Sequence, residues 1–254
     1  MDKRLMERMK KLMENASVQE DNYKCPKCRD LGYIFVKNDD NNEVACPCEC
    51  LAKKQAFEKL QKCGLSEAFK KKTFSTYTCS NQNQIQAKHR ALVYCKEFLS
   101  NNSSLILSGH SGTGKTHLGI AVMLELINKN INCKYVEYNN MIINLKQSVM
   151  DEENHMREME KYLNPRVLFI DDFLKGKTTP ADLNYIYRII NTRYITGKHV
   201  IISTERSIKE ILQWDEAVGS RLVEMAGKNI ITFDRNSQNH RLKDYLQQEE
   251  TYKY

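Results

Sequence analysis

Residues 109–116 read Gly-His-Ser-Gly-Thr-Gly-Lys-Thr, and this stretch decides how the chain folds. The apolar run 104–108 precedes it and is typical of a buried strand. Leu118, Ile120, Ala121 and Leu124 follow it at the spacing of a helix that packs one face on a core. The order strand, glycine-rich loop, helix predicts a loop that wraps a phosphate group.

The residue types of this loop suit phosphate chemistry. Glycine tolerates left-handed dihedrals, so successive backbone N–H groups can turn toward one anion, and the helix N-terminus adds a partial positive charge. Lys115 is expected to reach the β- and γ-phosphates of ATP, and the Thr116 hydroxyl to ligand Mg²⁺. The expected nucleotide contacts are Gly109, Ser111, Gly112, Thr113, Gly114, Lys115, Thr116 and His117, together with Asp171 and Thr204 further along the chain.

A second chemical signal lies at 166–173, Arg-Val-Leu-Phe-Ile-Asp-Asp-Phe. An unbroken apolar run on a strand is typical of a parallel sheet that is covered on both faces. Carboxylates at the end of such a strand lie beside the phosphate loop. We therefore expect Asp171 to help bind Mg²⁺ and Asp172 to orient or deprotonate the attacking water, with Lys115 and Asp172 as catalytic residues.

Further strands alternate with helices along the rest of the chain, which predicts an α/β fold with a helix-flanked, mainly parallel sheet. At the end of the strand expected at 199–204, Thr204 or Glu205 is placed to sense the γ-phosphate, and a simple helix cap is the alternative. The expected strands are 132–137, 199–204 and 229–234, and the expected helices are 118–129, 139–149, 180–196, 208–212 and 216–226.

Five of the nine cysteines fall between residues 25 and 50. Cys25 and Cys28 form one pair, and Cys46, Cys48 and Cys50 follow a polar turn, so two short strands are expected between the groups. Four thiolates can bind one Zn²⁺ and supply folding energy that so small a segment lacks. One of the last three cysteines is then not a ligand. Our predicted zinc ligands are Cys25, Cys28, Cys48 and Cys50.

Length and composition limit the remaining possibilities. The chain has 254 residues, 41% hydrophobic content and a formal net charge of +7, which permits contact with nucleic acid but does not require it. Its apolar runs are too short to span a membrane, and its start is too charged for a signal peptide, so we expect a cytoplasmic protein without a membrane partner. A helix near Leu5 and Met9 is expected to dock a partner or its own module.

The whole chain resembles the DnaC/DnaI-type helicase loaders of bacteria and phages, a branch of the AAA+ ATPases that also includes the IstB transposition helpers. The charged run Lys70–Lys72 indicates a solvated linker, so we place a boundary near residue 75 between a zinc-binding α+β module at 1–75 and an ATPase domain at 76–254, which by the resemblance is an AAA+ domain. The segments that carry the resemblance are 25–33, 109–118, 168–173, 191–194, 201–205 and 219–222.

This resemblance implies a function and several partners. The front module would bind the replicative hexameric helicase, and the ATPase domains would assemble around single-stranded DNA through their ATP sites. Arg221 matches the arginine finger that acts on a neighbouring subunit, and Arg193 is a weaker candidate for the same edge. Residues 139–163 lie where the related initiators insert a helix, so Lys146, His155, Arg157 and Lys161 are candidates to face DNA.

Two departures from the family pattern affect the expected activity. Asp172 stands where many AAA+ enzymes carry Glu, so we expect slow intrinsic ATP hydrolysis that rises with assembly or DNA. Glu205 stands where related ATPases often carry an amide, so the choice between Thr204 and Glu205 as the γ-phosphate sensor stays open. The alternatives are an IstB-type transposition helper, a zinc-containing adaptor that binds nucleotide without catalysis, and a small-molecule kinase, for which no arginine-rich lid segment is visible.

Overall fold

A computed structural model describes residues 23, 25–37, 43–101 and 103–233. The helix expected near Leu5 lies outside these described residues. The chain forms two compact units, which divide between Glu58 and Lys59. Residues 59–75 therefore belong to the second unit, whereas the expected boundary between functional domains near residue 75 stays a prediction.

The first unit is built on an antiparallel hairpin, as the alternation of apolar residues predicts. Strand β1 (Tyr33–Lys37) pairs with β2 (Glu43–Pro47) so that Tyr33 lies opposite Pro47 and Lys37 opposite Glu43. Helix α2 (Glu49–Lys62) begins directly after the hairpin. This arrangement brings the residues on either side of the hairpin, which include the cysteine pairs, to the same end of the two strands.

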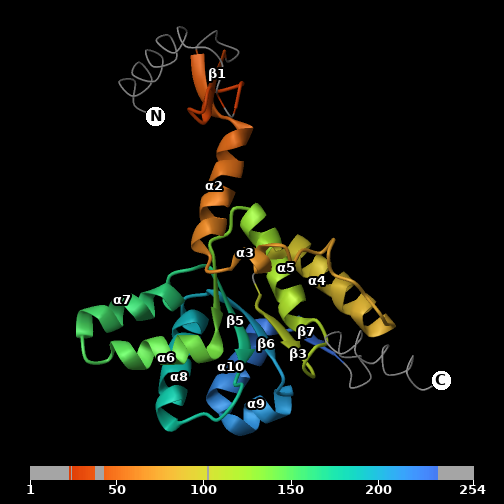
Figure 1. The fold of residues 1–254 in the computed structure, drawn as a ribbon, viewed down its shortest axis with the longest axis vertical. Coiled ribbons are helices and arrows are strands. Elements are labelled where there is room, and N and C mark those ends of the chain that lie inside the picture. Colours follow the sequence, from red (N-terminus) through yellow and green to blue (C-terminus); the bar gives the residue numbers. More distant parts are fainter. Residues whose placement is uncertain (1–22, 24, 38–42, 102, 234–254) are drawn as a thin grey trace, which may run out of the picture. The chain divides into compact units, whose positions relative to one another are not determined.

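A five-stranded parallel sheet forms the centre of the second unit, in the order β4-β5-β6-β3-β7 (Figure 1). It confirms the predicted α/β class. Because all strands run in one direction, their carboxyl ends share one edge, where the loops after β3, β5 and β6 meet. The strands are β3 (Leu105–Ser108), β4 (Cys133–Glu137), β5 (Val167–Phe173), β6 (His199–Thr204) and β7 (Ile230–Thr232).

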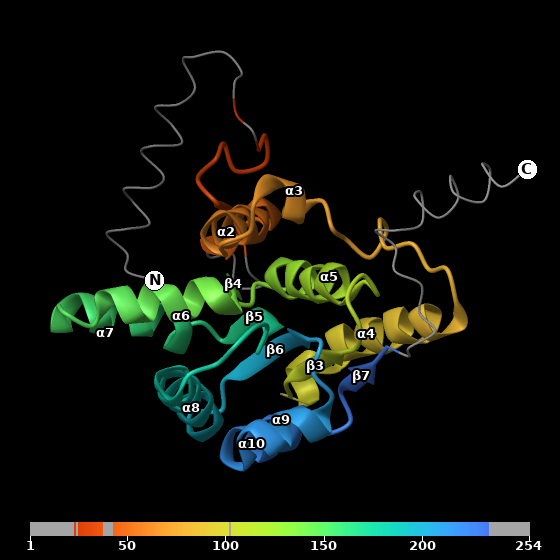
Figure 2. The ribbon, with the colours of Figure 1, turned by 60° about the horizontal axis from the view of Figure 1, so that its bottom comes forward.

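Helices cover both faces of this sheet (Figure 2). Helix α5 (Lys115–Asn128) packs on one face beside α4 (Gln82–Asn101). The other face carries a continuous apolar core, built from alternate strand residues such as Ile106, Ile170 and Ile202. The helices that border this core are α6 (Tyr138–Ser148), α7 (Glu152–Leu163), α8 (Pro180–Ile195), α9 (Ile208–Trp214) and α10 (Glu216–Ala226).

The structure adds elements that the sequence patterns do not predict. These are α4, α7 and the short helix α3 (Glu67–Lys70). The lysines expected in a solvated linker are engaged: Lys70 donates to Glu67 and Gln61, and Lys72 lies 4.0 Å from the centre of the Phe69 ring. Among the described residues, no helix combines the length and apolar character needed to cross a membrane.

Candidate functional site

The loop between β3 and α5 has the shape that phosphate binding requires. Gly112 and Gly114 both have positive φ angles, 76° and 99°. A Cβ atom on Gly114 would lie only 2.9 Å from atoms of the Tyr77 ring, so a side chain is excluded there by close packing as well as by backbone conformation. The loop is thus held tightly against the segment that precedes α4.

Lys115 occupies a buried position at the start of α5. Its side chain donates to the carbonyl oxygen of His110 over 2.7 Å, and the residue is 5% exposed. Burial lowers the pKa of Lys115, while the negative charges of Glu205, Asp172 and Asp171 oppose that shift. A buried ammonium group that makes its hydrogen bond to the loop backbone is suited to an anionic ligand at the same place.

Thr116 and Asp171, the two predicted Mg²⁺ ligands, are in direct contact. The Thr116 hydroxyl donates to Oδ1 of Asp171 over 2.9 Å. Tyr135 and Ser203 also donate to this carboxylate, a contact that the sequence patterns did not predict for either residue. A hydroxyl and a carboxylate oxygen are hard donors of the kind that Mg²⁺ prefers, so this pair fits the ion. The ligand roles themselves stay predictions.

Asp172 is positioned by an irregularity in β5. Ile170 pairs with Ile202 and Phe173 with Thr204, so β5 has one residue more than β6 between these pairs. Asp172 has a φ of 53°, and its N–H donates to the Ser203 hydroxyl over 3.0 Å. A bulge of this kind redirects a side chain that regular alternation would send to the other face. The Asp172 carboxylate accordingly borders the cavity and accepts a hydrogen bond from Lys175 over 2.8 Å.

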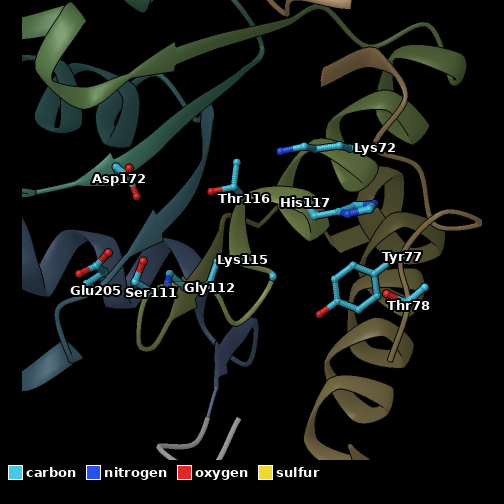
Figure 3. A pocket seen from close by; sticks show the side chains of 11 residues that line it. Lys72, Tyr77, Thr78, Ser111, Gly112, Lys115, Thr116, His117, Asp172 and Glu205 are labelled. Carbon is cyan, nitrogen blue, oxygen red and sulfur yellow. The ribbon is translucent and has the colours of Figure 1, made fainter. Parts of the chain in front are cut away.

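A cavity of about 210 Å³ lies beside the loop. Figure 3 shows Asp172 and Glu205 on one side, Tyr77 and Thr78 on the opposite side, and Lys115 and Thr116 between them. The lining residues are Lys72, Tyr77, Thr78, Ser111, Gly112, Gly114, Lys115, Thr116, His117, Asp172 and Glu205.

Four of the expected nucleotide contacts do not line this cavity, namely Gly109, Thr113, Asp171 and Thr204. Thr204 is fully buried, and its hydroxyl donates to the Phe173 carbonyl and accepts from the Arg206 N–H. Thr113 is likewise buried and donates to His110, which shapes the loop. Gly109 lies against Phe233: a Cβ atom added to Gly109 would lie 2.7 Å from the Cβ atom of Phe233. Of the two sensor candidates, Glu205 is therefore the one that borders the cavity.

The segment 72–78 contributes a wall of the cavity that the sequence analysis missed. His117 Nε2 lies 3.1 Å from the Thr73 carbonyl oxygen, and the His117 and Tyr77 rings meet edge to face at 5.2 Å. Tyr77 is 4% exposed, and its hydroxyl has no hydrogen-bond partner among the described residues. A buried hydroxyl without a partner at a cavity wall is suited to a polar ligand atom. No motif or periodicity in this segment marks it.

The two candidate arginines have opposite surroundings. Arg193 is 0% exposed and donates to the carbonyl oxygens of four residues, Tyr162, Pro165, Arg166 and His199. The expectation that Arg193 reaches a neighbouring subunit is wrong, because its guanidinium is enclosed in the core. Arg221 is half-buried on α10, outside the cavity lining of its own chain.

The candidate DNA-facing side chains on α6 and α7 all have local partners. Lys146 pairs with Asp182, Arg157 with Glu153 and Lys161 with Glu158. His155 Nδ1 lies 2.9 Å from the Ser148 hydroxyl. These contacts do not test a role in DNA binding.

The predicted zinc ligands come together in the first unit. The Sγ atoms of Cys25, Cys28, Cys48 and Cys50 all lie within 4.8 Å of one another, and Cys46 is not part of this cluster. Cys25 and Cys48 are 3.8 Å apart, close to the sulfur separation of about 3.8 Å that tetrahedral Zn–S bonds of ~2.3 Å imply. A backbone hydrogen bond from Cys28 is the main cause that lowers the pKa of Cys25 to about 7, whereas the neighbouring Cys28 thiol raises the pKa of Cys50. The donor set fits zinc.

The chain is similar in sequence to known ATP-binding proteins, mainly through its second unit. The sequence profile of the IstB-like ATP-binding proteins matches residues 50–234. The chain is 34% identical to YqaM of Bacillus subtilis strain 168 over 78% of its own length and 67% of that protein. It is 29% identical to the phage-like element PBSX protein XkdC of the same strain over 87% of each chain. An ATP-binding protein of insertion sequence IS5376 from Geobacillus stearothermophilus is 24% identical over 74% of this chain and 75% of that protein.

Solved structures share the fold of this unit. The DnaC helicase loader matches with a TM-score of 0.59 at 24% identity, covering 66% of this chain and all of that one. DnaI matches with a TM-score of 0.56 at 18% identity, covering 68% of this chain and 93% of that one. The helix-flanked parallel sheet is thus the fold that these proteins share.

Proposed function

The chain belongs to the family of IstB-like ATP-binding proteins, and from this premise we propose that it is an ATP-dependent loader of the replicative hexameric DNA helicase onto single-stranded DNA. The observation that carries this proposal is the four-cysteine cluster ahead of the ATP-binding domain. Cys25, Cys28 and Cys48 precede the residues that match the family profile. A separate metal-stabilised unit gives the chain a surface for a protein partner that the shared domain does not supply.

The nucleotide step follows from the cavity. Lys115 and the loop N–H groups would bind the phosphates of ATP, and Thr116 and Asp171 would hold Mg²⁺, which would supply charge neutralisation at the phosphates. Asp172 orients the attacking water. Because its side chain is one methylene shorter than Glu, intrinsic hydrolysis is slow and rises on assembly or DNA binding. Hydrolysis that is already fast in the isolated monomer contradicts this part of the proposal.

Assembly completes the site. Arg221 borders no part of its own cavity, so it acts on ATP held by a second copy of the chain. A guanidinium group delivered in this way stabilises the charge that develops on the γ-phosphate and links hydrolysis to assembly. ATP binding then favours the loaded assembly, and hydrolysis releases it.

A second function is an IstB-type transposition helper, which the similarity to the IS5376 protein favours. The two functions require different partners, so one experiment separates them. Size-exclusion chromatography with light scattering is run on the full chain mixed with the replicative helicase of its host, with and without Mg·ATP. A defined complex with the helicase supports the loader. Failure to co-elute under both conditions, with zinc content intact, overturns it.

The ATP site has its own test. Lys115→Ala is expected to lower ATP affinity at least about 10-fold, because it removes the one buried ammonium group that borders the cavity among the described residues. Isothermal titration calorimetry with Mg·ATP measures the effect. Lys96→Ala, on the exposed face of α4, is the matched control and keeps the original affinity. Equal affinities for the two variants contradict the assigned site.

A further inference from the structure

Helix α8 holds the Arg221 guanidinium in a fixed orientation. Its Nε donates to Oδ1 of Asn191 over 3.0 Å, and its Nη1 donates to the Ala217 carbonyl oxygen over 2.8 Å. The rings of Tyr187 and Tyr194 lie 5.4 Å and 5.7 Å from the guanidinium carbon. Hydrogen bonds in the plane of the group and rings near it restrict the rotations that an exposed arginine normally keeps.

Tyr187, Asn191 and Tyr194 form what we call the Arg221 cage. Their spacing of four and three residues places them on one face of α8, while Ile186, Ile190 and other residues of the helix face the core. The Tyr194 hydroxyl donates to Glu224 of α10 over 2.9 Å, which fixes the second ring. The cage therefore joins the two helices around one guanidinium group.

One edge of the caged guanidinium has no partner. Within the part of the chain that the structure describes, Nη2 of Arg221 makes no hydrogen bond, and no carboxylate lies within 4.0 Å of the group. Arg157 and Arg206, by contrast, pair with Glu153 and Glu210. A half-buried cation that is held rigidly but lacks an anion is suited to an anion from another molecule.

The surface around the cage identifies that molecule. Tyr187, Tyr194 and Ile195 are 39%, 36% and 72% exposed, and tyrosine and arginine are enriched at the energetic centres of protein interfaces. The complementary charge is the triphosphate of ATP bound in the nucleotide cavity, because the two carboxylates at that cavity, Asp172 and Glu205, already pair with Lys175. A second copy of this chain offers that cavity to the cage.

We propose that Asn191 is a positioning residue that orients Arg221, within the cage, toward the nucleotide cavity of a second copy. This inference rests on the proposed assembly of ATPase domains. Asn191 touches neither nucleotide nor reacting atoms, so it acts on the rate only through the guanidinium group. The hydrogen bond to Nε leaves Nη2 directed to the partner.

The first test compares turnover in matched variants. Asn191→Leu removes the acceptor at similar volume and is expected to lower the assembly-stimulated kcat about 10- to 100-fold, the usual cost of misplacing a reacting group by about 1 Å. The KM for ATP and the affinity measured by calorimetry stay within about two-fold. Tyr187→Leu removes one ring of the cage and is expected to lower the assembly-stimulated kcat in the same way. Tyr187→Phe keeps the ring and is expected to retain most of that kcat. An unchanged kcat in Asn191→Leu overturns the proposal, whatever Tyr187→Leu does.

The second test asks whether the effect acts between copies. Lys115→Ala has an intact Arg221 cage but a defective ATP site. Asn191→Leu has an intact ATP site but a defective Arg221 cage. Mixing the two is expected to restore part of the stimulated hydrolysis, because the Lys115→Ala copy supplies Arg221 to the intact site of its neighbour. No recovery in the mixture overturns the proposal. Co-elution with the helicase is measured separately, so the loader function and the cage fail independently.

Discussion

Arg193 and Arg221 carry the same guanidinium group into opposite environments. Arg193 connects the end of α7, the start of β5 and the start of β6 through their carbonyl oxygens. Arg221 lies at the surface between α8 and α10. At the scale of single residues, the residue type is the same in both cases. Burial and the type of hydrogen-bond acceptor therefore distinguish the structural arginine from the functional one.

Replacing the two arginines by leucine should separate these roles. Arg193→Leu leaves several buried carbonyl oxygens without donors and is expected to lower the free energy of unfolding by roughly 3 kcal/mol or more. Arg221→Leu loses two hydrogen bonds at a half-buried site and is expected to cost about 1 kcal/mol. Urea unfolding measures both values. If Arg221→Leu is the more destabilising variant, the assignment of the structural and surface arginines is wrong.

His199 makes the stability of the protein depend on pH. Burial, together with the charges of Arg166 and Arg193, lowers the pKa of His199 from 6.5 to about 4. The unfolded state therefore binds a proton at higher pH than the folded state does. The stability contributed by the neutral ring is complete above about pH 6.5 and is lost as the pH falls toward 4, by up to about 3 kcal/mol.

This pH dependence is tested with a pair of histidine variants. The free energy of unfolding is measured at about pH 7.5 and about pH 4.5 for His199→Leu and for the exposed control His89→Leu. The difference between the two pH values should shrink in His199→Leu and persist in His89→Leu. An unchanged difference in both variants contradicts the role of His199.

At the scale of elements, the site depends on how closely α5 packs against β5. Gly119 lies on the buried face of α5, and a Cβ atom there would be 2.4 Å from Cζ of Phe169. The absence of a side chain lets the helix approach the strand, which brings Thr116 at its start to Asp171 at the strand's end. The contact between the two predicted Mg²⁺ ligands is thus a consequence of helix–strand packing.

Gly119→Ala tests this packing. Alanine improves helix propensity by about 1 kcal/mol, whereas overpacking costs roughly 1–3 kcal/mol. Because the clash is with a ring on a central strand, we expect a net loss of about 1 kcal/mol in the free energy of unfolding, with weaker Mg·ATP binding. Adding Phe169→Leu should recover part of both losses. A more stable Gly119→Ala protein contradicts the close approach.

At the scale of the whole molecule, the chain contains two units that are stabilised in different ways. The second unit buries a large apolar core on the sheet. The described part of the first unit has a two-stranded hairpin, the beginning of α2 and four clustered cysteines. A segment of this size cannot bury enough apolar surface by itself, so the metal is expected to supply its folding energy.

Two single cysteine variants test this account. Cys48→Ser removes a member of the cluster and should lose zinc, whereas Cys46→Ser, which lies outside it, should retain one zinc ion per chain. Elemental analysis of the purified full chain measures the metal. Because the units are separate, Mg·ATP affinity should stay unchanged in both variants. Equal zinc content in the two variants contradicts the ligand set.

Local sequence was sufficient wherever the signal lies within one or two neighbouring elements. The loop 109–116 is flanked by its strand and helix, β6 and α10 have the predicted bounds, and the cysteine pairs lie at either end of one hairpin. The parallel sheet also follows, because strands separated by helices return in the same direction. Spacing along the chain determines all of these features.

Contacts between distant residues were decided only by the tertiary structure. Tyr77 and Glu205 reach the cavity from opposite sides, and Thr204 turns away from it. Arg193 is buried, although the resemblance made it a candidate for the subunit edge. The bulge in β5 directs Asp172 into the cavity against the alternation of the strand. Side-chain direction and distance in space depend on packing between elements, and a linear pattern of residue types does not contain that information.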